Sequence, residues 1–181
     1  GPLFGPGFIT ETLRLPGQEL RFRISPQSFF QTNTRGAEAL YGLLRQWVAS
    51  ASVEAALDLF CGGGGITLSL AGVCGKIYGA ELNAEAVEDA RQNAALNGIS
   101  NAEFFSGPVE RLLAALLALG ASCVIVDPPR AGLHPTVAAA LAERGPARLF
   151  YVSCNPEALA RDLGVLSARY TIVRAAVVDL F

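Results

Sequence analysis

From residue 55 onward, short apolar runs alternate with stretches whose apolar residues recur every three or four positions. The runs predict buried strands, and the stretches between them predict helices. The predicted strands are Ala55 to Phe60, Lys76 to Ala80, Ala102 to Phe105, Ser122 to Val126, Arg148 to Ser153 and Tyr170 to Val178. The predicted helices are Ile66 to Ala71, Ala84 to about Leu96, Val109 to Leu119, Pro135 to Glu143 and one that starts at Pro156. Strands that alternate with helices predict an α/β fold with a doubly wound, Rossmann-like parallel sheet.

The N-terminal part follows another pattern. Leu20, Phe22 and Ile24 alternate with arginines, which predicts a short half-exposed strand before a Phe-Phe-Gln-Thr-Asn loop. Thr34 is a candidate cap for a helix. The apolar face of that helix is Ala37, Leu40, Tyr41, Leu44, Trp47 and Val48. We therefore predict that residues 1–33 end a preceding β or linker segment and that residues 34–181 form one domain.

Unusual residues follow four of the predicted strands. They are Gly62–Gly65, Glu81, the stretch from Asp127 to Arg130, and Cys154. Because a doubly wound sheet binds ligands at the carboxyl ends of its strands, these residues predict one site at that edge.

The glycine loop Asp58-Leu-Phe-Cys-Gly-Gly-Gly-Gly65 lies between a predicted strand and a predicted helix. It fails the dinucleotide pattern G-x-G-x-x-G, because Thr67 or Leu68 occupies the last position, and no Gly-Lys-Ser/Thr follows as in a phosphate-binding loop. Glu81, at the end of the next strand, is suited to a ribose diol. This combination favours a nucleoside cofactor such as S-adenosylmethionine over one bound through pyrophosphate. The alternative is a tight turn with a surface glutamate.

Two further stretches carry candidate chemistry. The prolines of Asp127-Pro-Pro-Arg130 fix the backbone, so Asp127 is a rigid acceptor, and Arg130 offers a fork of donors. The alternative is a rigid turn with a solvated ion pair. Cys154 precedes a predicted helix, whose positive end favours the thiolate, so it is the best candidate nucleophile. His134 is a weak candidate for a general base.

Composition narrows the class of protein. Of 181 residues 51% are hydrophobic, and 14 basic against 16 acidic residues give a net charge of −2. This excludes a disordered tail and argues against nucleic-acid binding through bulk charge. The longest apolar stretch, Ala114 to Val126, is too short for a membrane helix. The four cysteines form no C-x-x-C pair, so we expect no metal site and a cytoplasmic location. The absence of methionine predicts a fragment or a processed chain.

The chain resembles the RNA uracil-5-methyltransferase family over nearly its whole length. The matching segments are Ser25 to Asn33, Leu57 to Gly62, Gly79 to Glu81, Asn93 to Asn97, Asp127 to Gly132, Val152 to Pro156 and Leu159 to Asp162. The resemblance implies a class I methyltransferase sheet that makes 5-methyluridine in ribosomal or transfer RNA, with S-adenosylmethionine as cofactor.

The resemblance also implies residue roles. Cys154 matches the family nucleophile, and the positions that match the cofactor site are Gln31, Phe60, Glu81 and Asp127. Gly62 and Gly65 would complete that site. Gln31 and Asp127 are also candidates to touch the target base, and Arg130 would stabilise an enolate or contact a phosphate.

Some features of the family are not found in this sequence. Its proton-abstracting Glu lies just beyond the motif that begins at Asp179, and the last strand, the N-terminal RNA-binding barrel and the iron–sulfur cysteines of some members are also missing. Gly65 and Pro108 replace an Asn of some members. We therefore expect weak cofactor binding and poor turnover. Two alternatives stay open: methylation of a nitrogen without covalent catalysis, and a non-catalytic RNA-binding module.

Overall fold

The computed structural model describes residues 7–26 and 28–180, which contain two sheets and six helices. The first sheet is an antiparallel hairpin of β1 (Ile9–Leu15) and β2 (Gln18–Ile24). The second is parallel, in the order β5-β4-β3-β6-β7. Its strands are β3 (Ala55–Leu59), β4 (Lys76–Glu81), β5 (Ala102–Ser106), β6 (Cys123–Val126) and β7 (Arg148–Tyr151). The first strand of this sheet along the chain is β3. The next two strands, β4 and β5, are added on one side of it, and β6 and β7 on the other. Such sheets bind ligands at the point between β3 and β6 where the strand order switches sides.

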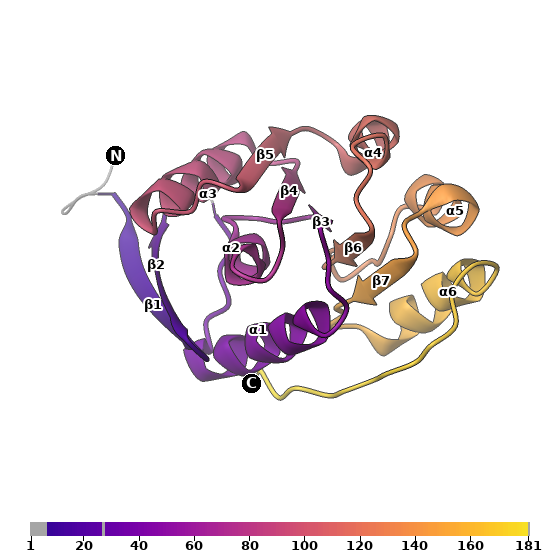
Figure 1. Cartoon of the computed structure of the whole chain (residues 1–181), viewed down its shortest axis with the longest axis horizontal. Helices are drawn as coiled ribbons and strands as arrows, with labels where there is room; N and C mark the ends of the chain where they lie inside the picture. Colours follow the sequence, from indigo (N-terminus) through magenta and orange to yellow (C-terminus); the bar gives the residue numbers. More distant parts are fainter. Residues whose placement is uncertain (1–6, 27, 181) are drawn as a thin grey trace.

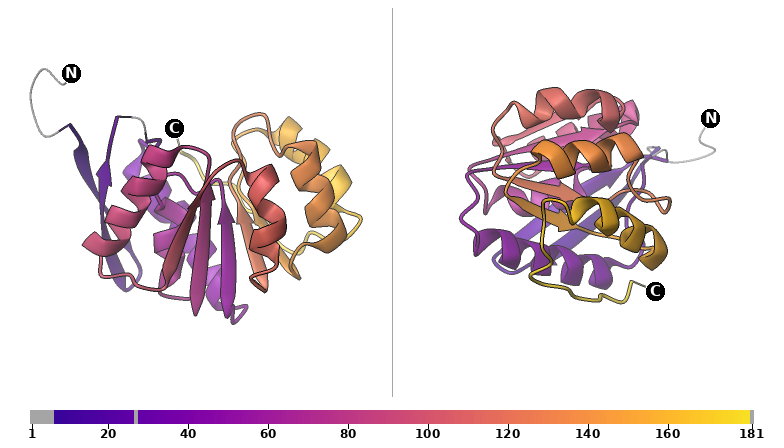
Figure 2. Two further views of the ribbon diagram at one scale, coloured as in Figure 1. Left: turned by 90° about the horizontal axis from the view of Figure 1, so that it is seen from above. Right: turned by 90° about the vertical axis from the view of Figure 1, so that its right-hand side faces the viewer.

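Helices cover both faces of the parallel sheet (Figure 1, Figure 2). They are α1 (Thr34–Ala49), α2 (Gly65–Ala71), α3 (Ala84–Leu96), α4 (Val109–Leu117), α5 (Pro135–Arg144) and α6 (Pro156–Leu166). One hydrophobic core lies under α1, α2 and α3 and the other under α4, α5 and α6. Because successive side chains of a strand point to opposite faces, Ala56 joins the first core and Leu57 the second. The predicted doubly wound fold is confirmed.

The N-terminal hairpin packs onto the same core as α1. Leu13, Leu15, Leu20 and Phe22 are all buried in it, and Gly17 turns the chain with a φ of +75°. The sequence analysis did not predict β1, because only the second half of this strand buries its apolar residues. The proposed boundary at residue 33 stays a prediction.

The predicted strand from Tyr170 to Val178 is wrong. This segment is extended but pairs with no strand among the described residues. It leaves α6 and runs along the molecule to α1, in yellow in Figure 1. There Leu180 packs against Gly36, where an added Cβ would lie 2.7 Å from Leu180 Cδ2. An apolar run becomes a strand only where a neighbouring backbone supplies hydrogen bonds, and Val173 and Val177 are instead exposed.

Several element boundaries differ from the prediction by one to two residues. Asn33, not Thr34, caps α1, because its side-chain oxygen accepts a hydrogen bond of 2.9 Å from the backbone N–H of Gly36. The strand expected to reach Ser153 ends at Tyr151. That outer strand, β7, contacts α1 through Phe150, whose ring stacks on the single tryptophan, Trp47, with centroids 6.5 Å apart.

Candidate active site at the carboxyl edge of the sheet

The glycine loop makes a tight connection between β3 and α2. Phe60 and Gly62 both have positive φ, +70° and +52°, and the N–H groups of Phe60 and Cys61 both donate to the carbonyl of Ala80. Glycine tolerates such φ values without strain, whereas Phe60 adopts its conformation at a cost. A Cβ at Gly65 would lie 2.8 Å from the hydroxyl oxygen of Tyr41. The loop is therefore fixed against both β4 and α1.

Glu81 ends β4 and binds the same loop. Its carboxylate accepts hydrogen bonds from the backbone N–H of Gly62 (3.1 Å) and of Asn83 (2.8 Å). The side chain is half-buried. A carboxylate held by backbone donors on both sides has a fixed orientation, and each oxygen keeps further lone pairs for a ligand.

A pocket opens beside this loop. It is lined by Phe29, Phe30, Gln31, Tyr41, Phe60, Cys61, Gly62, Gly63, Gly65, Ile66 and Asp127. Five of the residues predicted to bind the cofactor are in this lining, and the sixth, Glu81, is bonded to Gly62. The lining contributed by the described residues contains no lysine or arginine. With Asp127 in the lining and Glu81 beside it, the pocket favours a neutral or cationic ligand.

Two aspartates, Asp58 (buried) and Asp127 (half-buried), add to this negative character. Burial and repulsion from Asp127 and Glu81 raise the pKa of Asp58 to about 7, against a 2.5 Å hydrogen bond that its Oδ2 accepts from Thr67. Its Oδ1 has no hydrogen-bond partner among the described residues. Burial also raises the pKa of Asp127 to about 6. A nearby cation would favour the charged form of both acids. The sequence analysis assigned no role to Asp58, although an aspartate within an apolar strand was a usable signal.

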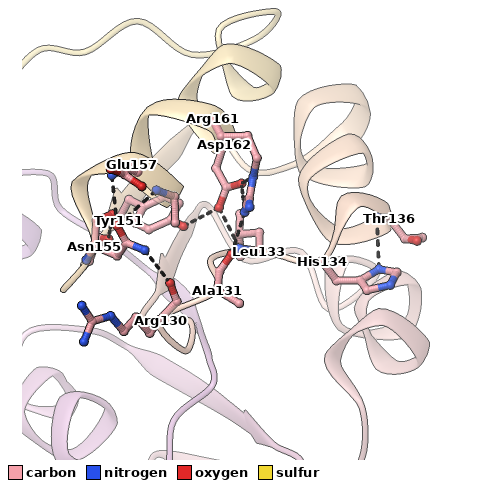
Figure 3. Close-up of polar contacts among 12 residues, drawn as sticks. Arg130, Ala131, Leu133, His134, Thr136, Tyr151, Asn155, Glu157, Arg161 and Asp162 are labelled. Atoms are coloured by element: carbon pink, nitrogen blue, oxygen red, sulfur yellow. Dashed lines mark hydrogen bonds and ion pairs between the residues drawn. The ribbon is translucent and has the colours of Figure 1, made fainter.

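The loop that follows β6 is held by α6 (Figure 3). Asp162, which is buried, accepts hydrogen bonds from the N–H of Leu133 (2.7 Å) and the hydroxyl of Tyr151 (2.6 Å). Arg161 donates to the carbonyl of Ala131 (2.8 Å). Gly132, between Ala131 and Leu133 in the sequence, has a φ of +83°. A Cβ at this position would clash with the side chains of both Arg161 and Asp162. The loop that carries Asp127 is thus fixed by a helix that begins two residues after Cys154.

Arg130 and Cys154 belong to this second part of the site and do not line the pocket. The side-chain amide of Asn155, the N-cap of α6, donates to the carbonyl of Arg130 at 3.0 Å. The guanidinium of Arg130 points away from the Asp162 cluster (Figure 3) and is exposed. Cys154 is exposed, whereas the other three cysteines are buried. The structure therefore places Cys154 beside the Arg130 loop, at the edge that the sequence predicted.

His134 has a structural partner. Its Nδ1 accepts a hydrogen bond of 3.3 Å from the N–H of Thr136, so it caps α5 (Figure 3). Among residues 7–26 and 28–180, no group of three or more His, Cys, Asp or Glu side chains could hold a metal ion. No helix of the described part of the chain is long and apolar enough to cross a membrane.

The class of protein follows from this fold and pocket. A Thermus thermophilus 16S rRNA methyltransferase, solved with AdoMet and guanosine, superposes with a TM-score of 0.70 at 21% identity, over 93% of this chain and 47% of that one. This likeness shows a Rossmann-like methyltransferase fold. The family is shown by the sequence, because the model of the tRNA (uracil-5-)-methyltransferase family matches residues 3–181. The chain belongs to that family.

Individual relatives agree with this assignment. The tRNA (uracil-54, C5)-methyltransferase of Pyrococcus abyssi, solved with S-adenosyl-L-homocysteine, has a TM-score of 0.75 and 36% identity over 90% of this chain and 38% of its own. Uncharacterised RNA methyltransferases of Geobacter sulfurreducens and Chlorobaculum tepidum are 44% and 43% identical, over 90% and 98% of this chain. The chain spans 33% and 37% of the length of these two relatives.

Proposed function

We propose that the protein transfers a methyl group from S-adenosylmethionine to C5 of a uridine in ribosomal or transfer RNA, through a covalent bond between Cys154 and C6. Family membership supports the reaction class. The observation that carries the mechanism is the exposure of Cys154, beside the Arg130 loop and at the carboxyl edge of the sheet. We further propose a cytoplasmic location, because all four cysteines are free.

The pocket residues fit the cofactor. S-adenosylmethionine carries a sulfonium and an ammonium, and the pocket is lined by Asp127, with Asp58 and Glu81 close by and no basic side chain in its described lining. Glu81 would accept the ribose hydroxyls, and the turn at Gly62 leaves room for the nucleoside to approach the backbone. Gln31, from the segment after β2, and Phe60, from the glycine loop, would line the same pocket.

The proposed mechanism addresses the poor nucleophilicity of uracil C5. The thiolate of Cys154 adds to C6, and the electron pair of the C5–C6 bond becomes an enolate over C5 and O4. Arg130 is placed to stabilise that negative charge or a nearby phosphate. S-adenosylmethionine supplies the methyl group that C5 accepts. A base then removes the proton from C5, the C6–sulfur bond breaks, and Cys154 leaves as thiolate.

The base that removes the C5 proton is assigned by resemblance alone. The resemblance places this glutamate just after the motif that begins at Asp179. A base inside folded RNA must also be turned out of its stack before Cys154 can reach C6. Because Cys154 and Arg130 are exposed, they are accessible to such a nucleotide.

The test is a trapped adduct. RNA with 5-fluorouridine at the target carries no removable proton at C5, so the enzyme should remain bound to C6 after methylation. Mass spectrometry of the full-length protein with this RNA and S-adenosylmethionine should map the nucleotide to Cys154. Attachment to another residue, or methylation without any adduct, would contradict the mechanism and favour transfer to a nitrogen.

A further inference from the structure

Three polar side chains, two on α3 and one on its C-cap residue, are bonded to the backbone of β2 and of the turn that follows it. Asp89 accepts from the N–H of Ser25 at 2.9 Å, and Asn93 accepts from the N–H of Arg23 at 2.7 Å. Asn97 accepts from the N–H of Arg21 at 2.8 Å. Asn93 and Asn97 also donate back to the carbonyls of the same two arginines, at 3.0 and 2.7 Å.

The regular spacing explains why one helix can bond a strand in this way. Residues four apart on a helix are separated by about 6 Å along its axis, and residues two apart on a strand by about 6.7 Å. Asp89, Asn93 and Asn97 therefore stay in step with Ser25, Arg23 and Arg21. The amides of Asn93 and Asn97 each provide the donor and the acceptor that a neighbouring strand would provide. They therefore satisfy the backbone groups on the free edge of β2. A two-stranded hairpin on its own is only marginally stable.

Asn93 makes one contact that Asn97 does not. Its side-chain nitrogen also donates to the carbonyl of Gly63 at 3.1 Å, in the loop that lines the pocket. Asn93 is 1% exposed, so these hydrogen bonds form away from water. All three hydrogen-bonding groups of its amide are thus used, two on β2 and one on the glycine loop.

The turn after β2 leads to the other wall of the pocket. Asp89 also accepts hydrogen bonds from the hydroxyls of Ser25 and Ser28, and Phe29, Phe30 and Gln31 come directly after. The two walls, one from the N-terminal hairpin and one from the glycine loop, are therefore connected through α3.

We propose that Asn93 is a positioning residue for the cofactor pocket: its amide sets the glycine loop against the hairpin whose following segment carries Gln31. Cofactor binding then orders β2, and an ordered β2 favours cofactor binding. Such coupling is reciprocal. The inference rests on the cofactor named in the proposed function.

The first test compares Asn93→Asp with Asn97→Asp in the full-length protein. Each substitution removes one amide donor from β2, but only Asn93→Asp places a carboxylate oxygen against the carbonyl of Gly63. Calorimetry with S-adenosylhomocysteine should show about tenfold weaker binding for Asn93→Asp and less than about a twofold change for Asn97→Asp. Equal effects of the two variants would overturn the proposal, as would wild-type affinity in Asn93→Asp.

The second test needs no variant, so it holds even if Asn93→Asp fails to fold. In the wild-type protein, S-adenosylhomocysteine should slow hydrogen exchange of the Arg23 amide more than that of the Arg21 amide. Equal protection of both amides would overturn the coupling while leaving the cofactor assignment intact. A wild-type protein that does not bind S-adenosylhomocysteine would contradict the proposed function, and this inference with it.

Discussion

The two halves of the candidate site differ in how they are built. The half formed by β3, β4 and α3 has a glycine loop fixed on both sides and a buried acid, Asp58, whose pKa is raised by burial. The half formed by the loops after β6 and β7 exposes Cys154 and Arg130, and α6 fixes only the backbone that carries them. A small cofactor needs a pocket of fixed shape, whereas a thiol that must reach a base in RNA has to be accessible. Substitutions should therefore affect the two halves separately.

The largest expected effect is that of Cys154→Ala on methyl transfer. Removing the nucleophile should lower the single-turnover rate on uridine RNA by at least about a thousandfold. Binding of S-adenosylhomocysteine and the unfolding temperature should stay unchanged, because Cys154 lies outside the pocket lining and is exposed. Methylation that survives this substitution would rule out the covalent mechanism.

Asp162→Ala should have the next largest effect, on the stability of the fold. The N–H of Leu133 and the hydroxyl of Tyr151 would lose their buried acceptor, which should cost about 3 kcal/mol in denaturant unfolding. Glu157→Ala on the exposed first turn of the same helix is the matched control and should cost less than about 1 kcal/mol. Adduct formation at Cys154 should slow more in Asp162→Ala than cofactor affinity falls, because Asp127 is the one residue of the described pocket lining on the loop that Asp162 holds. A loss confined to cofactor affinity would contradict the separation of the two halves.

Cofactor affinity should depend on pH. Asp58 and Asp127, with pKa values of about 7 and about 6, hold protons near pH 5 and lose them by about pH 8. Affinity for the cationic S-adenosylmethionine should therefore rise over that range, by up to about tenfold per pH unit for each proton released. Calorimetry in buffers of different ionisation enthalpy measures those protons.

Asp127→Asn should flatten this pH dependence of cofactor affinity, and Glu85→Gln, at an exposed acid on α3, should leave it unchanged.

The stability of the fold should depend on pH in the opposite direction. Because the raised pKa values make the folded state bind more protons, the stability contributed by Asp58 and Asp127 is present below their usual pKa of 3.8 and is lost as pH rises through about 6 to 7. Affinity that falls with rising pH would contradict the role given to these acids.

The smallest expected effect is that of His134→Ala. The N–H of Thr136 would lose its acceptor at the start of α5, which should cost less than about 1 kcal/mol. Methylation should be unchanged. A clear loss of activity with unchanged unfolding would show that His134 has a chemical role after all.

The sequence predicted the parallel sheet well because its strands are apolar runs buried on both faces. It predicted the placement of Gln31, Phe60 and Asp127 in one pocket through resemblance and the rule for strand ends. The sequence-based prediction was wrong where strand formation depends on a neighbouring strand. The segment from Tyr170 to Val178 has the apolar character of a strand, but no neighbouring backbone in the described structure pairs with it.

The sequence also could not assign partners to buried polar groups. Asn93 and Asp162 both belong to segments that resemble the family. However, Asn93 contacts Gly63, 30 positions away in the sequence. Asp162 contacts Leu133, 29 positions away. The spacing of Asp89, Asn93 and Asn97 was visible, but only the position of β2 beside α3 gives it a meaning. Polar periodicity on a helix is usually a solvated face, so the pattern alone would not have been decisive.

The ring stack between Trp47 and Phe150 gives the protein a built-in optical reporter. The single indole lies against β7, the strand that leads to Cys154, and its helix α1 also contacts the glycine loop through Tyr41. Its emission spectrum should therefore respond when the outer strand separates from α1. Stopped-flow fluorescence could then follow that separation without an attached dye.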